Sequence, residues 1–265
     1  MRDRLLLLSL AASAILIASE TPKNGAGRHS FPLQPGGRVS IETTHGSATH
    51  SSVEISGWDQ ESVEIAGGSW DSLNQGDATL RIQGLAGDNS EAVQIHVPRR
   101  VTLDAVASTN GWIRVSGIVG DVSLKSSNGG IEASDVHGLL TVHSSNGAIV
   151  VRGQDGSSRI HSSNGGVETG AVSAAPLDVH TSNGPIVVRM PASLHAQLDA
   201  HTSNGNIQSD FDVKPGVIKR NQWEGVIGGG GPMLKLSSSN GAIQLLRDKA
   251  QMERVTSTFT PGPVQ

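Results

Sequence analysis

The chain has 265 residues, a net charge of −4 with neutral histidines, and no cysteine. Without cysteine it lacks disulfides, thiolate metal ligands, thiol nucleophiles and a lipid-anchored cysteine. Its net negative charge and the lack of a Lys/Arg cluster argue against a nucleic-acid partner. Its 33 glycines and absence of tyrosine suit many tight turns around a thin aliphatic core, so we expect one elongated β domain.

The first 19 residues have the pattern of a secretory signal peptide. A basic segment at 1–4 precedes an apolar run at 5–17, and the small residues Ala18 and Ser19 offer a cleavage region. An uncleaved leader would be the expected contact with a membrane. We therefore assign residues 1–19 to a signal peptide and 20–35 to a flexible linker. The expected location is outside the cytoplasm, in the periplasm, the cell envelope or the medium.

From Gly36 onward, apolar residues alternate with polar ones, as in half-buried strands. Val39 and Ile41 lead into a degenerate turn at 45–47. Further strands are expected around 53–55, 63–65, 80–82 and 93–97, with protruding loops at 67–76 and 84–90. At Leu103 and Val106 the alternation slips by one residue, which predicts a β-bulge.

A motif of the form Ser/Thr-Ser/Thr-Asn-Gly-x-Ile/Val recurs along the chain. Its asparagines are Asn110, Asn128, Asn146, Asn164, Asn183, Asn204 and Asn240. The intervals, by subtraction, are 18, 18, 18, 19, 21 and 36 residues, and a short fixed period indicates a solenoid. Asn-Gly predicts a turn because both residues tolerate positive φ. Apolar pairs flank each turn, so each coil should be strand, turn, strand.

We therefore predict an all-β fold, a parallel single-stranded β-helix over residues 36–246 with about 18 residues per coil. Such a coil is too short for a helix plus two strands, and strands should stack about 4.8 Å apart. The alternation does not settle handedness. Extended past Leu124, it places Ser126 and then Asn128 inside the coil. It thus predicts that Asn128, Asn146 and Asn164 are buried and bonded to corner backbone.

The C-terminal part of the repeat is irregular. The interval from Asn204 to Asn240 is twice 18 residues, which suggests one coil that has lost its turn near Asn221. The glycines at 228–231 predict a loop and not a phosphate cradle, because no Lys-Ser/Thr follows them. Residues 247–265 are expected to form a cap or a disordered tail.

Several motifs resemble a family of exported bacterial β-strand-repeat proteins called "putative adhesins", whose function is unknown. These are the repeated Asn-Gly motif, Ile55-Ser56-Gly57-Trp58-Asp59, Val97-Pro98, and the Gly-rich run before Pro232. The resemblance covers about residues 36–246. It implies a single-stranded β-helix associated with the cell envelope, and it brings no catalytic residues.

The residues themselves favour no enzyme. Asp121, Asp135 and Asp155 fall at different positions of the repeat, unlike the clustered carboxylates of polysaccharide-processing β-helices. No Gly-x-Ser-x-Gly motif or ordered Ser/His/Asp set is present. We assign no catalytic, cofactor-binding or metal-ligating residue.

One outward column stands out, three residues before successive asparagines. It consists of Lys125, His143, His161, His180 and His201. Asp178 and Asp199 lie two residues earlier on the same face. The simplest interpretation is a solvated polar ladder. A divalent-metal site is one alternative, and another is ice or crystal binding by Ser127, Ser145 and Ser163. Repulsion between stacked imidazolium ions should lower their pKa below the ~6.5 of free histidine.

The sequence thus predicts a secreted or envelope-associated scaffold or adhesion module without enzymatic activity. The expected partner is a surface glycan or an envelope protein whose identity the sequence leaves open. A polysaccharide-processing β-helix enzyme is the first alternative, and a metal- or pH-responsive binding module based on the histidine column is the second.

Overall fold

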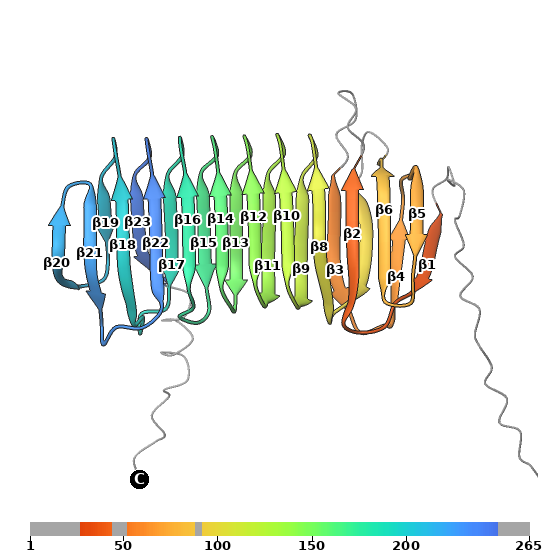
Figure 1. The fold of residues 1–265 in the computed structure, drawn as a ribbon, viewed down its shortest axis with the longest axis horizontal. Coiled ribbons are helices and arrows are strands. Elements are labelled where there is room, and N and C mark those ends of the chain that lie inside the picture. The colour runs from red at the N-terminus through yellow and green to blue at the C-terminus, as the bar shows by residue number, and fades with distance from the viewer. Residues whose placement is uncertain (1–26, 44–51, 88–91, 249–265) are drawn as a thin grey trace, which may run out of the picture.

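The computed structural model describes residues 27–43, 52–87 and 92–248. These residues form 23 strands and no helix. Within these ranges, no helix has the length and apolarity needed to span a membrane. The strands belong to two sheets that face each other along the length of the domain (Figure 1). The all-β solenoid that the repeat predicts is thereby confirmed.

Most coils contribute one strand to each sheet. In spatial order, sheet A contains β20 (Val213–Lys219), β21 (Gln222–Ile227), β18 (Ala196–Thr202), β22 (Met233–Ser238), β16 (Leu177–Thr181), β14 (Ser158–Ser162), β12 (Leu140–Ser144), β10 (Val122–Ser126), β8 (Val101–Ser108), β2 (Gly37–Thr43), β6 (Thr79–Leu85) and β5 (Ser72–Gln75). Sheet B contains β1 (Arg28–Pro32), β4 (Ser62–Ala66), β7 (Val93–Pro98), β3 (Val53–Trp58), β9 (Ile113–Val119), β11 (Ile131–His137), β13 (Ile149–Gln154), β15 (Val167–Ala171), β17 (Ile186–Met190), β23 (Ile243–Arg247) and β19 (Ile207–Ser209).

Aliphatic side chains stack coil upon coil between the two sheets. Val122 and Leu124 of β10 lie in register with Leu140 and Val142 of β12. All four side chains are at most 2% exposed. Burying such columns is the main favourable term in folding. The period-two alternation in the sequence therefore corresponds to an inward and an outward face on each strand.

A buried hydroxyl closes each corner from the inside. The Oγ of Ser144 donates to the carbonyl of Gly147 at 3.1 Å and accepts from the N–H of Gly147 at 3.0 Å. The same inward position is held by Ser126, Ser162, Thr181, Thr202 and Ser238. The inward orientation predicted for Ser126 is confirmed.

The asparagines, in contrast, lie on the outside, and the prediction that they are buried is wrong. Asn128, Asn146 and Asn164 are exposed. The strand alternation ends at Ser126, because the next three residues form a bend. The alternation of inward and outward side chains therefore does not predict the orientation of the residues after Ser126. The asparagine amides form a ladder. Each Nδ2 donates to the Oδ1 of the asparagine one coil away, at 2.8 Å from Asn146 to Asn128 and from Asn164 to Asn146.

The turn glycines are needed for a reason other than positive φ. Among the described residues, the glycines with positive φ do not include those of the Asn-Gly turns. A Cβ on Gly147 would lie 2.0 Å from the carbonyl oxygen of Gly129, and one on Gly165 would lie 2.0 Å from that of Gly147. The corners stack so closely that backbone contacts backbone. Glycine is required because it has no side chain, not because of its backbone freedom.

Spatial order and chain order differ at both ends of the solenoid. In sheet A, β2 lies between β8 and β6, and β22 lies between β16 and β18. In sheet B, β3 lies between β9 and β7, and β23 lies between β17 and β19. The first and last complete coils of the chain are therefore each paired on both sides.

Beyond the last parallel coil, the segment near Asn221 folds back as a hairpin. β20 and β21 pair antiparallel, with Lys219 opposite Gln222 across a two-residue turn, and β21 pairs antiparallel with β18. The prediction of a coil that has lost its turn is wrong here, because a chain reversal replaces the corner. The glycines at 228–231 link β21 to β22 outside any strand, as predicted.

Antiparallel strands also cap the N-terminal end, formed by β1, β4 and β5. β1 lies within residues 20–35, which were expected to be a linker, and β5 lies within 67–76, which were expected to be a loop. The predicted bulge is confirmed in β8, where the register shifts between Leu103 and Val106. Residues 1–19, the turn at 45–47 and nearly all of 247–265 lie outside the described residues, so their assignments stay predictions.

Candidate functional site

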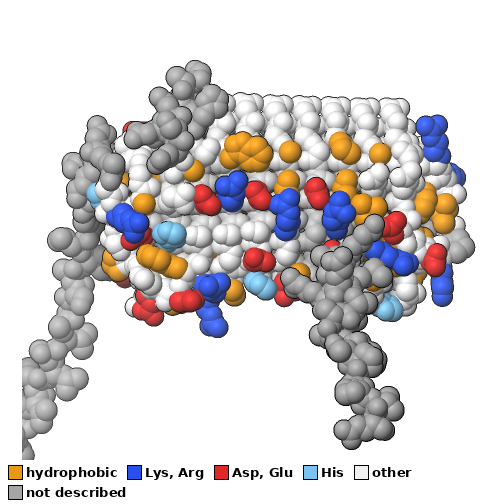
Figure 2. All heavy atoms as spheres, turned by 180° about the vertical axis from the view of Figure 1, so that it is seen from behind, with side chains coloured by type: hydrophobic (Ala, Val, Ile, Leu, Met, Phe, Trp, Pro, Cys, Tyr) orange, Lys and Arg blue, Asp and Glu red, His pale blue; other side chains and the backbone are white. Residues whose placement is uncertain are grey.

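The outward face of sheet B carries paired charges. Arg114 Nε donates to Glu132 Oε2 at 3.1 Å, and Arg152 Nη1 donates to Glu132 Oε1 at 2.7 Å. Further along, Arg189 Nε donates to Glu168 Oε1 at 3.1 Å. Acidic and basic side chains accordingly alternate in a row across this face (Figure 2). Since each of these arginines meets a carboxylate, little uncompensated charge is left for a ligand.

The outward face of sheet A carries a row of imidazoles. His143, His161 and His180 lie in register on β12, β14 and β16, and Lys125 precedes them on β10. The ring centroids of the first two histidines are 5.8 Å apart, and those of the second two are 5.0 Å apart with ring planes 14° from parallel. We call His143, His161 and His180 the histidine stripe.

The fourth predicted member, His201, is not a neighbour of the others. β22 is inserted between β16 and β18, so that Ser237 pairs with His180 on one side and with His201 on the other. The predicted stacking is confirmed for three histidines and wrong for the fourth. The cause is the inserted coil, which changes the spatial order without changing the repeat.

Crowding of the rings has an electrostatic consequence at the centre of the stripe. Partial burial, followed by repulsion from His180 and then from His143, lowers the pKa of His161 below its ordinary value of 6.5. The expected direction is confirmed at this residue. At neutral pH the central ring is therefore uncharged.

Unpaired cations surround the stripe. Within the described part of the chain, Lys125, Arg159 and Lys235 are exposed and take part in no ion pair, although Lys235 pairs in register with Asp178 and Asp199. Arg159 and Asp178 lie two residues before His161 and His180, on the same outward face. Charged side chains around the stripe thus form fewer ion pairs than those on sheet B.

A shallow hollow of about 330 Å³ lies next to the stripe on sheet A. Its polar lining includes Asp104, which accepts an ion pair from Arg38 at 3.1 Å. Asp121 also lines it and accepts the backbone N–H of Leu139 at 3.1 Å. The hydroxyls of Ser123 and Thr141, two residues before Lys125 and His143, have no hydrogen-bond partner among the described residues.

No metal centre forms in the described residues, since no group of three or more His, Asp or Glu side chains there is arranged to hold an ion. The near-parallel rings of His161 and His180 direct their nitrogens side by side, whereas metal ligation needs lone pairs that converge on one point. Asp178 and Asp199 lie on opposite sides of β22, in register with Lys235. The divalent-metal alternative therefore finds no support in this arrangement.

The corner opposite the Asn-Gly turns brings together three polar residues spaced by 18. Ser173 Oγ donates to Asp155 Oδ1 at 2.6 Å, and His137 Nδ1 lies 3.4 Å from Asp155 Oδ2. These hydrogen bonds, that from Ser173 first, lower the pKa of Asp155 below 3.8. In a nucleophilic triad the imidazole contacts the hydroxyl. Here the hydroxyl bonds to the carboxylate and not to the imidazole, so these three residues do not have the order of a triad.

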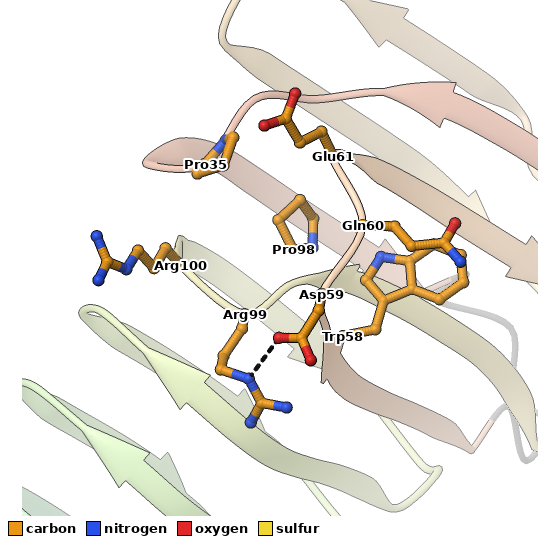
Figure 3. Close-up of a pocket in the computed structure, with 8 residues that line it drawn as sticks. All are labelled: Pro35, Trp58, Asp59, Gln60, Glu61, Pro98, Arg99 and Arg100. Carbon is orange, nitrogen blue, oxygen red and sulfur yellow. Dashed lines mark hydrogen bonds and ion pairs between the residues drawn. The ribbon is translucent and has the colours of Figure 1, made fainter.

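Trp58 and Asp59 of the Gly-Trp-Asp motif line a small pocket of about 220 Å³ between the β3–β4 and β7–β8 turns (Figure 3). Asp59 accepts from Arg99 Nε at 3.1 Å, which connects the two turns. Trp58 donates from Nε1 to the carbonyl of Ser62 at 2.7 Å and stacks on His96 with centroids 5.1 Å apart. The pocket is smaller than typical ligand sites. Asp59 and Trp58 both bond to the surrounding turns, so the motif has a structural explanation.

Sequence reasoning missed Arg159 and Lys235, as well as the group around Asp155. A signal for each was available. Arg159 and Lys235 occupy the same position of the repeat as Asp178, and His137, Asp155 and Ser173 are spaced by 18 residues. Alignment of the whole sequence at the repeat period would have placed both sets. It could not have shown which charges find partners.

Comparisons with known proteins bear on the family. No curated protein matches the chain. A solved structure from Clostridium sporogenes described as "a putative cell adhesion protein" is 12% identical, covers 86% of this chain and 100% of its own, and has a TM-score of 0.39. The family model of Toastrack DUF4097 matches residues 20–246. That match confirms the family resemblance inferred from the motifs, and this chain belongs to the Toastrack DUF4097 family.

Proposed function

We propose that the chain is a non-enzymatic scaffold or adhesion module that works outside the cytoplasm. The observation that supports this most is the distribution of polar groups. In the described residues they form rows along two open sheet faces, one residue per coil. Such a surface is suited to contact with an extended partner, as are the long faces of other solenoids. The basic and apolar start of the chain supports export.

A test of this proposal joins location with binding. The full chain, produced in its own host with a C-terminal tag, should be found in the envelope or medium fraction. Beads coated with the purified chain should be retained on cell-surface material or isolated envelope glycans. Beads coated with the heat-unfolded chain are the control. Recovery of the chain only from the cytoplasm, or equal retention of both kinds of bead, would overturn the proposal.

The competing function is polysaccharide processing, and the carboxylate best placed for it is Asp155. The purified chain should release no new reducing ends from a panel of acidic and neutral polysaccharides. Product formation that is abolished in Asp155→Asn would replace the scaffold proposal with an enzymatic one. Product that survives in Asp155→Asn would equally overturn it, by placing the activity elsewhere.

A further inference from the structure

Sheet A differs from sheet B in a way that points to a ligand. Arg114, Arg152 and Arg189 on sheet B each bond to a glutamate. On sheet A, Lys125 and Arg159 adjoin the histidine stripe without any ion-pair partner in the described chain. Cations left unpaired on one face, beside groups that gain charge in mild acid, favour an anionic partner.

The charge of this region depends on pH. The charged groups facing the stripe from the neighbouring strands are Lys125, Arg159, Asp178 and Lys235, with Asp199 and Glu224 beyond β22. With neutral imidazoles, the three cations are balanced by the three carboxylates. Protonation of His143, His161 and His180 adds three positive charges along a single line. The face therefore becomes more positive when its histidines are protonated in mild acid.

The geometry selects a linear ligand over a single ion. Neighbouring rings are 5.8 and 5.0 Å apart, and the row runs from coil to coil along an open sheet. An extended polymer with regularly placed anionic groups can contact several rings at once. A small anion can contact only one or two of them, because the rings lie in a row along the sheet and do not surround a single point.

The adjoining hollow indicates the type of polymer. Ser123 and Thr141 offer free hydroxyls, and the carboxylates of Asp104 and Asp121 lie in the same lining. Hydroxyls and carboxylates both form hydrogen bonds with the hydroxyl groups of a sugar, which a polyphosphate chain lacks. Its volume of about 330 Å³ lies at the lower end of the range of small-ligand sites.

We propose that the histidine stripe, with Lys125, Arg159 and the adjoining hollow, is a binding site for a carboxylated polysaccharide that binds in mild acid and is released near neutral pH. The site rests on the proposed adhesion function and names its ligand class. Negative charge on the ligand stabilises the imidazolium ions, so binding takes up protons. By linkage, affinity must rise as the pH falls.

The experiment measures binding of the full chain to polygalacturonate at about pH 5 and about pH 7.5, at low and at physiological salt. Affinity should rise by roughly tenfold at the lower pH, a usual size for two coupled binding events. His161→Gln should reduce that rise, because it removes one of the three imidazoles in the row. His137→Gln is the matched control, an exposed histidine outside the stripe, and should behave as the wild type. Should His161→Gln unfold, His143→Gln serves in its place.

Two further arms separate charge from sugar recognition. Polyphosphate offers charge alone, and Ser123→Ala with Thr141→Ala should weaken binding of polygalacturonate but not of polyphosphate. Equal pH dependence in the wild type and His161→Gln would overturn the proposal. So would tighter binding of polyphosphate or of anionic lipid vesicles than of polygalacturonate.

The outcomes for this site and for the proposed function can be told apart. If coated beads adhere to cell-surface material at neutral pH, and His161→Gln leaves the binding of polygalacturonate in acid unchanged, the adhesion function stands and this site is wrong. If purified chain binds polygalacturonate in acid while the chain is found only in the cytoplasm, the site stands and the adhesion function is wrong.

Discussion

The two faces of the solenoid come from one repeat, yet they differ in electrostatics. Sheet B pairs its arginines with glutamates in a self-contained row, and sheet A places imidazoles beside unpaired cations. The inward side chains and corners that support both faces are the same. The difference teaches that, in a solenoid, the core positions fix the fold while outward positions are free to carry separate chemistry on each side.

The largest expected effect comes from breaking the corner on which both faces depend. Gly165→Ala would place a Cβ 2.0 Å from the carbonyl of Gly147, and neither backbone can move without disturbing the stack. We expect a loss of at least about 3 kcal/mol in the free energy of unfolding. Gly166→Ala is the matched control, because its Cβ would meet only Pro185 at 3.5 Å. Equal denaturation midpoints for the two variants would contradict the close stacking.

The next effect separates the inner and outer groups of the same turn. Ser144→Ala leaves the N–H of Gly147 without its partner at a buried corner, and should cost about 1–3 kcal/mol. Asn146→Ala removes exposed amide bonds that water can replace, and should cost about 0.5–1 kcal/mol. Urea unfolding of both variants measures the difference. A larger loss for Asn146→Ala would reverse this inside-outside assignment.

The third effect is a dependence of stability on pH that belongs to sheet A. The pKa of His161 is lowered in the fold from 6.5, so the unfolded chain binds this proton more tightly. The free energy of unfolding should be highest above pH 6.5 and fall as the pH decreases below it. His161→Gln should flatten this slope between pH 7.5 and 5. An unchanged slope in thermal melts would show that the ring makes no such contribution.

The smallest effect concerns the ion row of sheet B. Glu132→Gln removes the acceptor shared by Arg114 and Arg152, whose side chains are 51% and 59% exposed. Such exposed pairs contribute below about 1 kcal/mol each and are screened by salt. The loss should therefore be small at low salt and vanish at high salt. A loss that persists in high salt would mean that packing, and not charge, holds this row.

Periodicity was enough to predict most of the fold. The recurrence of Asn-Gly and the alternation around Val122 and Leu124 led to a stacked solenoid with these residues inside. The same alternation gave the wrong orientation for Asn128, because inward and outward side chains alternate only along extended backbone and the corner is bent. It also failed to explain the glycines, since the contact between Gly147 and Gly129 is between coils and has no trace in local propensity.

The candidate site was predictable only in part. The column containing His143, His161 and His180 follows from the repeat alone. The separation of His201 does not, because the insertion of β22 is a long-range event. Which cations stay unpaired depends on side-chain geometry across strands. The sequence alone therefore could not show that Arg152 forms an ion pair and Arg159 does not.

The placement of the terminal coils limits how the solenoid can change length. β2–β3 and β22–β23 are each paired on both sides. Antiparallel strands cap sheet A at both ends and sheet B at its N-terminal end, and β19 forms the other edge of sheet B. Neither of these two coils therefore offers an open parallel edge on which an appended unit could continue. A unit duplicated in the middle, between β10 and β16, would meet neighbours identical to those it replaces. Gain or loss of repeats should therefore be confined to the centre, where each added coil would also add one more outward residue to every row.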